Sequence, residues 1–218
     1  MVLVLGFEGY GGRSKNPSEA IVEALDKQTV GSTVVKGAVM PVQFEGLAQR
    51  VATLLHKHQP SVVIAFGLWP GEPVIRLERV GINTADFEIA DNAGNLVQNT
   101  PVVPNRPDAH LATLPLHAIQ DQLLEAGIPA RLSGTAGTYL CNALMFSLLD
   151  HCAQHLPQTR CGFIHVPYLP MQAADMLQRL AQDATLEYHQ RSDTASMSLD
   201  TIVTAAGLAI QTTLDSLS

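Results

Sequence analysis

The feature that most restricts how this chain can fold is an alternation of short apolar runs with amphipathic segments. The apolar runs are rich in Val and Ile, which favour strands. The strand candidates are Val2–Gly6, Thr33–Met40, Ser61–Phe66, Ala130–Ser133 and Gly162–His165. Strands separated by helices in this manner are typical of a sheet with helices on both faces. We therefore predict an α/β fold.

Two of the intervening segments carry local helix signals. Asn16 is a favourable N-cap ahead of Pro17, and apolar residues then recur at helical spacing. The same spacing runs from Phe44 to His58, until Gln59-Pro60 ends the pattern. We expect the first helix to cover one face of the sheet and the second to connect two strands.

Two further segments are less regular. Residues 91–110 are polar and rich in Asn, Gly and Pro, so we expect an irregular loop that forms one wall of a site. Residues 198–217 alternate small and apolar residues with Thr, Asp and Gln, which is consistent with a closing helix packed on the sheet. The sequence contains no internal repeat and no low-complexity tract.

Composition limits both the organisation and the partners. With 218 residues, 46% of them hydrophobic and 15% charged, we expect one compact domain over residues 1–218. The formal charge of −7 and the lack of any Lys or Arg run exclude nucleic acid and membrane surfaces as expected partners. Because the apolar run that begins at Val2 is short and has no basic stretch before it, we expect a cytoplasmic protein.

The three cysteines are expected to be reduced thiols. A disulfide framework needs an even number of cysteines, whereas this chain has three, at positions 141, 152 and 161. They also lack the paired spacing of a zinc site. Cys141 alone has the setting of a nucleophile, because it follows a strand and a turn of small residues and opens a run that continues helically through Leu149. A helix N-terminus and a nearby imidazole favour the thiolate. The alternative is a buried apolar side chain, which is the interpretation for Cys152 and Cys161.

A base and an orienting acid can be proposed for this thiol. His165 ends an apolar run, and the carboxyl ends of strands are where open α/β sheets build sites. Glu78 precedes Val80 and Ile82, whose alternation suggests one strand with all three side chains on the same face. A carboxylate bonded to one imidazole nitrogen fixes the tautomer of the ring. The alternatives are a strand-end histidine bonded to backbone, and a Glu78 paired with Arg76 or Arg79.

Other hydrolytic and transfer chemistries lack their usual signatures. The chain has no P-loop, no dinucleotide fingerprint, no His-Glu-x-x-His and no Gly-x-Ser-x-Gly element. The set of Cys, His and Glu is therefore the strongest candidate for catalysis.

Four blocks, in order along the chain, resemble pyroglutamyl peptidase I, that is, the pyrrolidone-carboxylate peptidases of peptidase family C15. The first contains Gly6-Phe7-Glu8-Gly9-Tyr10-Gly11-Gly12 and then Asn16-Pro17-Ser18, and the second spans residues 67–95. The third spans residues 127–142, and the fourth is Gly162-Phe163-Ile164-His165-Val166-Pro167-Tyr168-Leu169-Pro170. Each block alone is weak evidence, whereas four in order are specific.

The resemblance implies a fold, a reaction and a set of site residues. The implied fold is a single-domain α/β/α sandwich with a twisted, mixed, mostly parallel sheet of the phosphorylase/hydrolase-like kind. The implied enzyme is a cysteine exopeptidase that removes N-terminal pyroglutamate from peptides through a thioester, without metal or cofactor, as a homodimer or homotetramer. The implied catalytic residues are Glu78, Cys141 and His165. The implied substrate-binding residues are Phe7, Tyr10, Asn16, Val42, Leu68, Ile89, Tyr139 and Leu140.

The chain also departs from the family pattern. Glu72 stands where the family usually has Arg or a small residue, Glu88 stands where it usually has Arg, and Gly9 and Ala90 replace prolines. Tyr10 replaces a Phe of the ring pocket. Two other functions therefore stay open: an amidase or peptidase that acts on another N-blocked or cyclic substrate, and a catalytically silent binding protein of the same fold.

Overall fold

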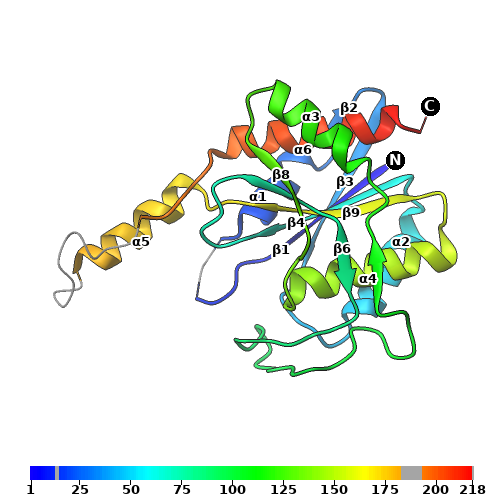
Figure 1. Ribbon diagram of the computed structural model, residues 1–218, viewed down its shortest axis with the longest axis horizontal. Coiled ribbons are helices and arrows are strands. Elements are labelled where there is room, and N and C mark those ends of the chain that lie inside the picture. Colours follow the sequence, from blue (N-terminus) through cyan, green and yellow to red (C-terminus); the bar gives the residue numbers. More distant parts are fainter. Residues whose placement is uncertain (13–14, 183–192, 218) are drawn as a thin grey trace.

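Figure 1 shows the computed structural model, which describes residues 1–12, 15–182 and 193–217. Its main element is a seven-stranded sheet with the order β2-β3-β1-β4-β9-β5-β8. The strands are β1 (Val2–Phe7), β2 (Thr29–Val30), β3 (Thr33–Met40), β4 (Val62–Leu68), β5 (Ile75–Glu78), β8 (Ala130–Ser133) and β9 (Arg160–Val166). Strands β1, β3, β4 and β9 are parallel, whereas β5 is antiparallel to β9 and parallel to β8, and β2 is antiparallel to β3. The sheet is thus mixed and mostly parallel, as expected.

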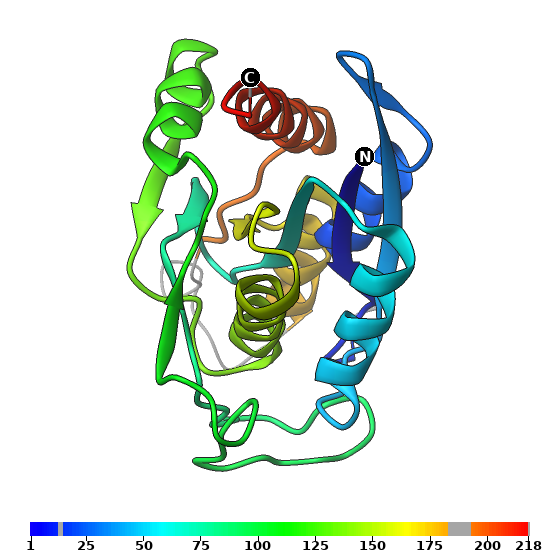
Figure 2. The same cartoon turned by 90° about the vertical axis from the view of Figure 1, so that its right-hand side faces the viewer.

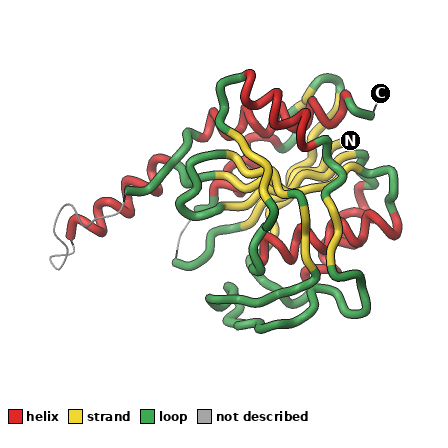
Figure 3. The backbone as a smooth tube through the Cα atoms, in the orientation of Figure 1, coloured by secondary structure: helices red, strands yellow, loops and turns green. Residues whose placement is uncertain are grey.

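Helices cover both faces of this sheet. One apolar cluster joins α1 (Pro17–Leu25), α3 (Leu116–Glu125) and α6 (Leu199–Asp215) to one face. A second cluster joins α2 (Leu47–His58) and α4 (Leu140–His155) to the other face, and Figure 2 shows this arrangement from the side. Helix α5 (Pro170–Gln182) extends away from the body of the molecule (Figures 1 and 3). The α/β/α sandwich is confirmed.

The alternation of side chains along the strands decides which residues face α4. In β9, Ile164 and Val166 belong to the cluster under α1, α3 and α6, whereas Phe163 belongs to the cluster under α2 and α4. His165 follows the parity of Phe163 and therefore lies on the α4 face. In β5, Ile75 and Leu77 face α3 and α6, which places Arg76 and Glu78 on the α4 face as well.

Local sequence signals predicted most element boundaries well. Asn16 caps α1 by accepting a hydrogen bond from the backbone N–H of Ser18 at 3.1 Å. Helix α2 begins at Leu47, three residues later than expected, because Gly46 adopts a left-handed conformation with φ of 74°. At its other end Gln59 adopts the left-handed C-cap that precedes Pro60.

The expected strand through Glu78, Val80 and Ile82 was wrong. The chain leaves the main sheet at Arg79, whose N–H donates to Ser133 O and whose C=O accepts from Ala112 N. Val80 and Ile82 lie in β6 (Val80–Ile82), which pairs with β7 (Ala109–Leu111) in a separate two-stranded sheet. They therefore do not share a strand face with Glu78.

The long excursion between β6 and β7 is largely irregular, as expected for residues 91–110, although β7 begins at Ala109. Asp91 organises its middle by accepting from the N–H groups of Phe44, Ala93 and Asn95. Burial raises the pKa of Asp91, but these hydrogen bonds outweigh burial and lower it below its usual value. The excursion is thereby attached to the segment before α2.

No helix in the described part of the chain is long and apolar enough to cross a membrane.

Candidate active site

A buried histidine–carboxylate pair lies on the α4 face of the sheet. His165 Nδ1 and Glu78 Oε1 are 2.8 Å apart, and the residues are 1% and 0% exposed. The same Oε1 accepts a hydrogen bond from Arg76 Nε at 3.2 Å. A neutral His165 that donates from Nδ1 presents Nε2 as its proton acceptor. The pair thus has the tautomer that a general base requires.

Cys141 lies in the first turn of α4, next to this pair. Its sulfur occupies the space above Gly67, because a Cβ built on Gly67 would lie 2.8 Å from Cys141 Sγ and 2.8 Å from Phe163 Cζ. Gly67 is the direct neighbour of His165 across the β4–β9 ladder. The glycine therefore allows the thiol-bearing helix to approach the end of the sheet where the histidine lies.

The N-terminus of α4 has amide donors that no side chain caps. Tyr139 is the N-cap residue, and it makes no side-chain cap hydrogen bond. The first N–H groups of a helix lack partners within the helix, and the helix dipole makes this end attractive to negative charge. Asn142 fixes the end in place, since its side chain bonds both backbone groups of Ile82 and the C=O of Thr84.

Burial favours the neutral forms of both the thiol and the imidazole. Cys141 keeps part of its surface open to solvent, yet the surrounding protein raises the pKa of its thiol to about 12, with a smaller contribution from the charge of Glu78. Burial lowers the pKa of His165, against the opposing effect of Glu78. The sequence favoured a resting thiolate at a helix N-terminus, whereas the structure favours a neutral pair whose proton moves during attack.

Cys141 and His165 both line a cleft of about 360 Å³. The other lining residues are Tyr10, Leu68, Trp69, Pro70, Asp86, Glu88, Ile89, Ala136, Gly137, Thr138 and Tyr139. The cleft is therefore largely apolar and aromatic close to the thiol, and Asp86 and Glu88 supply its acidic groups. Among the described residues, no group of three or more His, Cys, Asp or Glu side chains is placed to hold a metal ion.

The sequence is similar to those of known peptidases. The sequence model of the peptidase C15 family, described as pyroglutamyl peptidase, matches residues 1–216. The chain belongs to this family. It is 42% identical over 176 residues to the pyrrolidone-carboxylate peptidase of Pyrococcus furiosus, which covers 81% of the chain and 85% of that relative. It is 39% identical over 213 residues to pyrrolidone-carboxylate peptidase 2 of Photorhabdus laumondii, with coverages of 98% and 91%.

A solved structure extends the similarity to the fold. The crystal structure of pyrrolidone carboxyl peptidase from Pyrococcus furiosus superposes with a TM-score of 0.92 at 37% identity. The match covers all of this chain and 99% of the other. The architecture described above is thus the architecture of a pyroglutamyl peptidase.

The structure brings four of the eight predicted substrate-binding residues to the cleft. Tyr10, Leu68, Ile89 and Tyr139 line it, and Ile89 is 48% exposed. The rings of Tyr10 and Tyr139 are 6.0 Å apart between centroids, and the Tyr139 hydroxyl donates to Ala90 O. These side chains form an apolar wall beside the thiol.

The other four predicted residues are buried and do not line the cleft. Phe7, Val42 and Leu140 are buried in the apolar cluster under α2 and α4. Asn16 is buried too and donates from Nδ2 to Glu8 O at 3.0 Å. It therefore braces the loop after β1 without lining the cleft.

Two residues near the histidine were not predicted from the sequence. Trp69 lines the cleft, and its ring packs edge-on against His165 at 5.0 Å between centroids. Arg76 was considered only as an alternative partner for Glu78, whereas in the structure Glu78 bonds Arg76 and His165 together. The available signal was the i, i+2 spacing of Arg76 and Glu78, which places two opposite charges on one strand face.

Proposed function

We propose that this protein is a cysteine exopeptidase that hydrolyses the amide bond after an N-terminal pyroglutamyl residue. The observation that carries the proposal is that Cys141 shares a cleft with the His165–Glu78 pair in a chain of this family. The triad of Glu78, Cys141 and His165 is part of the proposal. A nucleophile, a base and an acid that orients the base are the parts that this chemistry needs.

The reaction follows from the neutral resting pair. The Cys141 thiol transfers its proton to His165 Nε2 as the sulfur attacks the carbonyl carbon of the pyroglutamyl residue. Uncapped N–H groups at the start of α4 stabilise the negative oxygen of the tetrahedral intermediate. His165 then protonates the leaving amine, and a thioester remains. A water molecule loses a proton to His165, attacks the thioester, and releases pyroglutamate and the thiol.

Selectivity is argued from the apolar wall of the cleft. The pyroglutamyl ring has no ammonium group, so Tyr10, Ile89 and Tyr139 can surround it at little desolvation cost. An ordinary N-terminal residue would bring a charged amine into the same space, at a cost of several kcal/mol if the amine found no partner there. This difference supports an enzyme that accepts blocked N-termini and rejects free ones.

The test is release of aminocoumarin from pyroglutamyl-aminocoumarin. We expect the wild-type protein to release it and Cys141→Ala to lose essentially all turnover. Cys152→Ala is the matched control, because Cys152 is buried in α4 away from the cleft, and it should keep the wild-type rate. Equal release by wild type and Cys141→Ala would contradict the proposal. A panel of other N-acyl and cyclic substrates separates it from the two other functions.

Location and assembly complete the proposal. We infer from the family resemblance a cytoplasmic protein that forms a homodimer or a homotetramer. The exposed apolar side chains of α5, described below, support self-association.

A further inference from the structure

We propose that Arg76 is a positioning residue for the reaction: its guanidinium fixes Glu78 and Trp69 against the ring of His165 and holds the segment that leads to Cys141. This inference rests on the proposed function and deepens it. It assigns a role to a side chain that touches none of the reacting groups of the proposed mechanism.

Arg76 and His165 are direct neighbours across the β5–β9 ladder. From this position Arg76 Nε donates to the same Glu78 oxygen that bonds His165 Nδ1, at 3.2 and 2.8 Å respectively. The other carboxylate oxygen, Oε2, is buried and has no hydrogen-bond partner in the described part of the chain. Arg76 therefore supplies both the compensating charge and a second directional contact for Glu78, which is 0% exposed.

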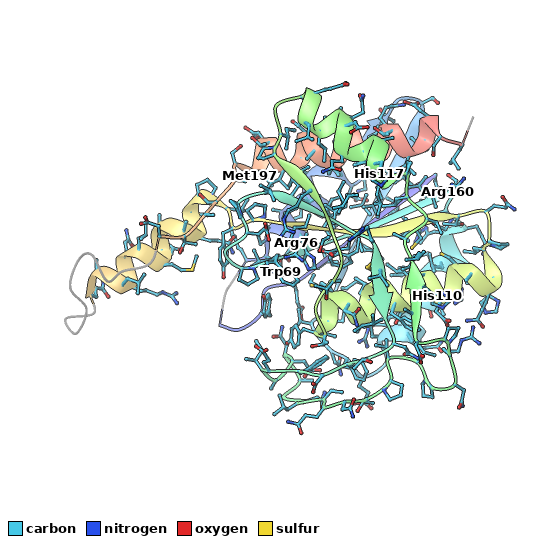
Figure 4. The ribbon with its side chains drawn as sticks, viewed as in Figure 1. Trp69, Arg76, His110, His117, Arg160 and Met197 are labelled. Atoms are coloured by element: carbon cyan, nitrogen blue, oxygen red, sulfur yellow. The ribbon has the colours of Figure 1, made fainter. Side chains whose placement is uncertain are left out.

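The guanidinium plane also holds Trp69. Its central carbon lies 3.7 Å from the centroid of the Trp69 ring, and that ring packs edge-on against His165. Figure 4 shows the labelled side chains of Arg76 and Trp69 next to each other. A cation over an aromatic face is attractive, and burial strengthens the attraction. His165 is thus held by Glu78 at Nδ1 and by Trp69 at its ring, and both of these groups contact Arg76.

A second nitrogen of the Arg76 guanidinium, Nη2, reaches the end of β8 and the segment after it. Nη2 donates to Ser133 Oγ at 2.6 Å and to Thr135 O at 3.0 Å. This segment continues through Ala136 and Tyr139, which line the cleft, into the α4 turn that carries Cys141. One guanidinium therefore connects the carboxylate, the ring support and the approach to the nucleophile.

Glu72 keeps this arginine in its orientation. It is 8% exposed and accepts from Arg76 Nη1 at 3.1 Å, and from Arg131 Nε and Nη2 at 3.3 and 3.1 Å. Glu72 does not line the cleft. The glutamate at this position, which departs from the family pattern, therefore serves this ion-pair network and does not contact the substrate space. Arg131 reaches Glu72 from the surface, where its side chain is 51% exposed.

The charges around His165 set the expected pH dependence. The charged and titratable groups that face it from the described residues are Glu78, Arg76, Glu72 and Cys141, with Asp86 and Glu88 across the cleft. Burial lowers the pKa of His165 most, Glu78 and Glu72 oppose that effect, and the positive charge of Arg76 adds to it. The acid limb of kcat/KM should therefore lie below pH 6.5 in the wild type.

The decisive variant is Arg76→Met, which keeps the length of the side chain and removes its charge and donors. We expect kcat to fall about 10- to 100-fold, because Glu78 and His165 lose alignment, while KM changes little. We also expect the acid limb of kcat/KM to move to higher pH, because the positive charge of Arg76 no longer opposes the effect of Glu78, which raises the pKa of His165. Arg76→Lys keeps the charge without the planar fork, so it should restore the acid limb and only part of kcat.

The matched control is Arg131→Met, which removes the other arginine of the network. Arg131 contacts neither Glu78 nor Trp69, so this variant should keep the wild-type kcat and pH profile. Thermal unfolding followed by circular dichroism shows whether each variant is folded. If Arg76→Met does not fold, Arg76→Lys decides the question.

Several outcomes would overturn the inference. A folded Arg76→Met variant with wild-type kcat and acid limb would do so, as would a loss confined to KM or an equal loss in Arg131→Met. A folded Arg76→Lys variant with full kcat would do so when the Met variant does not fold. If the wild type fails to cleave pyroglutamyl-aminocoumarin, the proposed function fails separately. In that case the inference is tested by the way the rate of Cys141 alkylation by iodoacetamide depends on pH. Arg76→Met should change this dependence relative to the wild type, whereas Arg131→Met should not.

Discussion

At the scale of single residues, the site depends on the lack of a Cβ atom at Gly67, which lets the sulfur of Cys141 lie close to the sheet. Gly67 lies under the sulfur of Cys141 and beside the ring of Phe163, and both neighbours would come within 2.8 Å of an added Cβ. Real Cβ atoms do not approach other atoms so closely, so both the Cys141 sulfur and the Phe163 ring would have to shift relative to Gly67.

Gly67→Ala should consequently reduce both activity and stability. We expect kcat/KM to fall by about 100-fold or more, because a displacement of the thiol by a few tenths of an ångström to 1 Å misaligns it with His165. Overpacking of this kind costs about 1–3 kcal/mol in the free energy of unfolding. Gly207→Ala in α6 is the control, since its added Cβ meets no atom within 4 Å and alanine favours the helix. Wild-type activity in Gly67→Ala would contradict the close approach.

Two residues of the proposed triad could be selected from the sequence because each stands at the end of an element, whereas Glu78 was selected from an alternation with Val80 and Ile82 that proved wrong. Cys141 opens a helix after a turn, and His165 closes an apolar run, so their positions at one edge of the sheet follow from strand direction. The contacts of Arg76 could not be predicted in the same way. They depend on β5 running antiparallel to β9, and no local pattern in four residues fixes the partner of a strand.

At the scale of elements, local signals and long-range contacts contribute differently. The Val- and Ile-rich runs predicted β1, β4 and β9, because those strands are buried and their composition reflects it, and the partly exposed strands β3 and β8 were predicted as well. The separation of β5 from β6 was missed because hydrogen bonds between Arg79 and two distant residues, Ala112 and Ser133, turn the chain at Arg79. The wall of the cleft was expected from residues 91–110, yet the lining side chains are Asp86, Glu88 and Ile89, just before that range.

This loop segment gives the cleft its charge. Asp86 and Glu88 are exposed side chains that line it together with Cys141 and His165. In the proposed mechanism the substrate extends from the scissile bond toward solvent, and we expect its second residue to pass near these acids. Exposed charges interact weakly, by a few tenths to about 1 kcal/mol per pair, and salt screens them.

Peptides with a cationic second residue should therefore be preferred. We expect kcat/KM for pyroglutamyl-Lys peptides to exceed that for the matched pyroglutamyl-Glu peptides by about threefold to tenfold at low salt. Glu88→Gln should reduce the ratio, and 0.5 M salt, at a Debye length of about 4 Å, should nearly abolish it. Glu125→Gln on α3 is the control, because that carboxylate lies outside the cleft. A ratio that ignores both salt and Glu88 would contradict the role of these acids.

At the scale of the whole molecule, α5 is the element least integrated into the body. It leaves the sandwich after β9, and Ala173 is its buried residue. Met171 and Leu177 expose 57% and 44% of their surface. A projecting helix with apolar side chains in water is typical of an interface, and the inferred homo-oligomer provides a second copy to cover it.

Leu177→Asp should weaken self-association. A charge placed in an apolar contact loses its hydration without gaining a partner. The oligomer of the variant should therefore dissociate at a higher protein concentration than the wild-type oligomer does. Light scattering coupled to size-exclusion chromatography measures the mass directly. Leu124→Asp is the control, since Leu124 is 51% exposed on α3, within the body of the sandwich. A monomeric wild type, or equal masses for wild type and Leu177→Asp, would contradict the expectation.

The antiparallel insertion of β5 also limits how this enzyme can vary. Only four residues form the strand, and its two charged side chains alternate with Ile75 and Leu77. A shift of one position would turn the aliphatic pair toward the imidazole and push both charges beneath α3 and α6. Insertions and deletions should thus be tolerated only in the parts of the excursion between β6 and β7 that lie outside the cleft wall, whereas a single deletion in β5 would unfold the core and the site together.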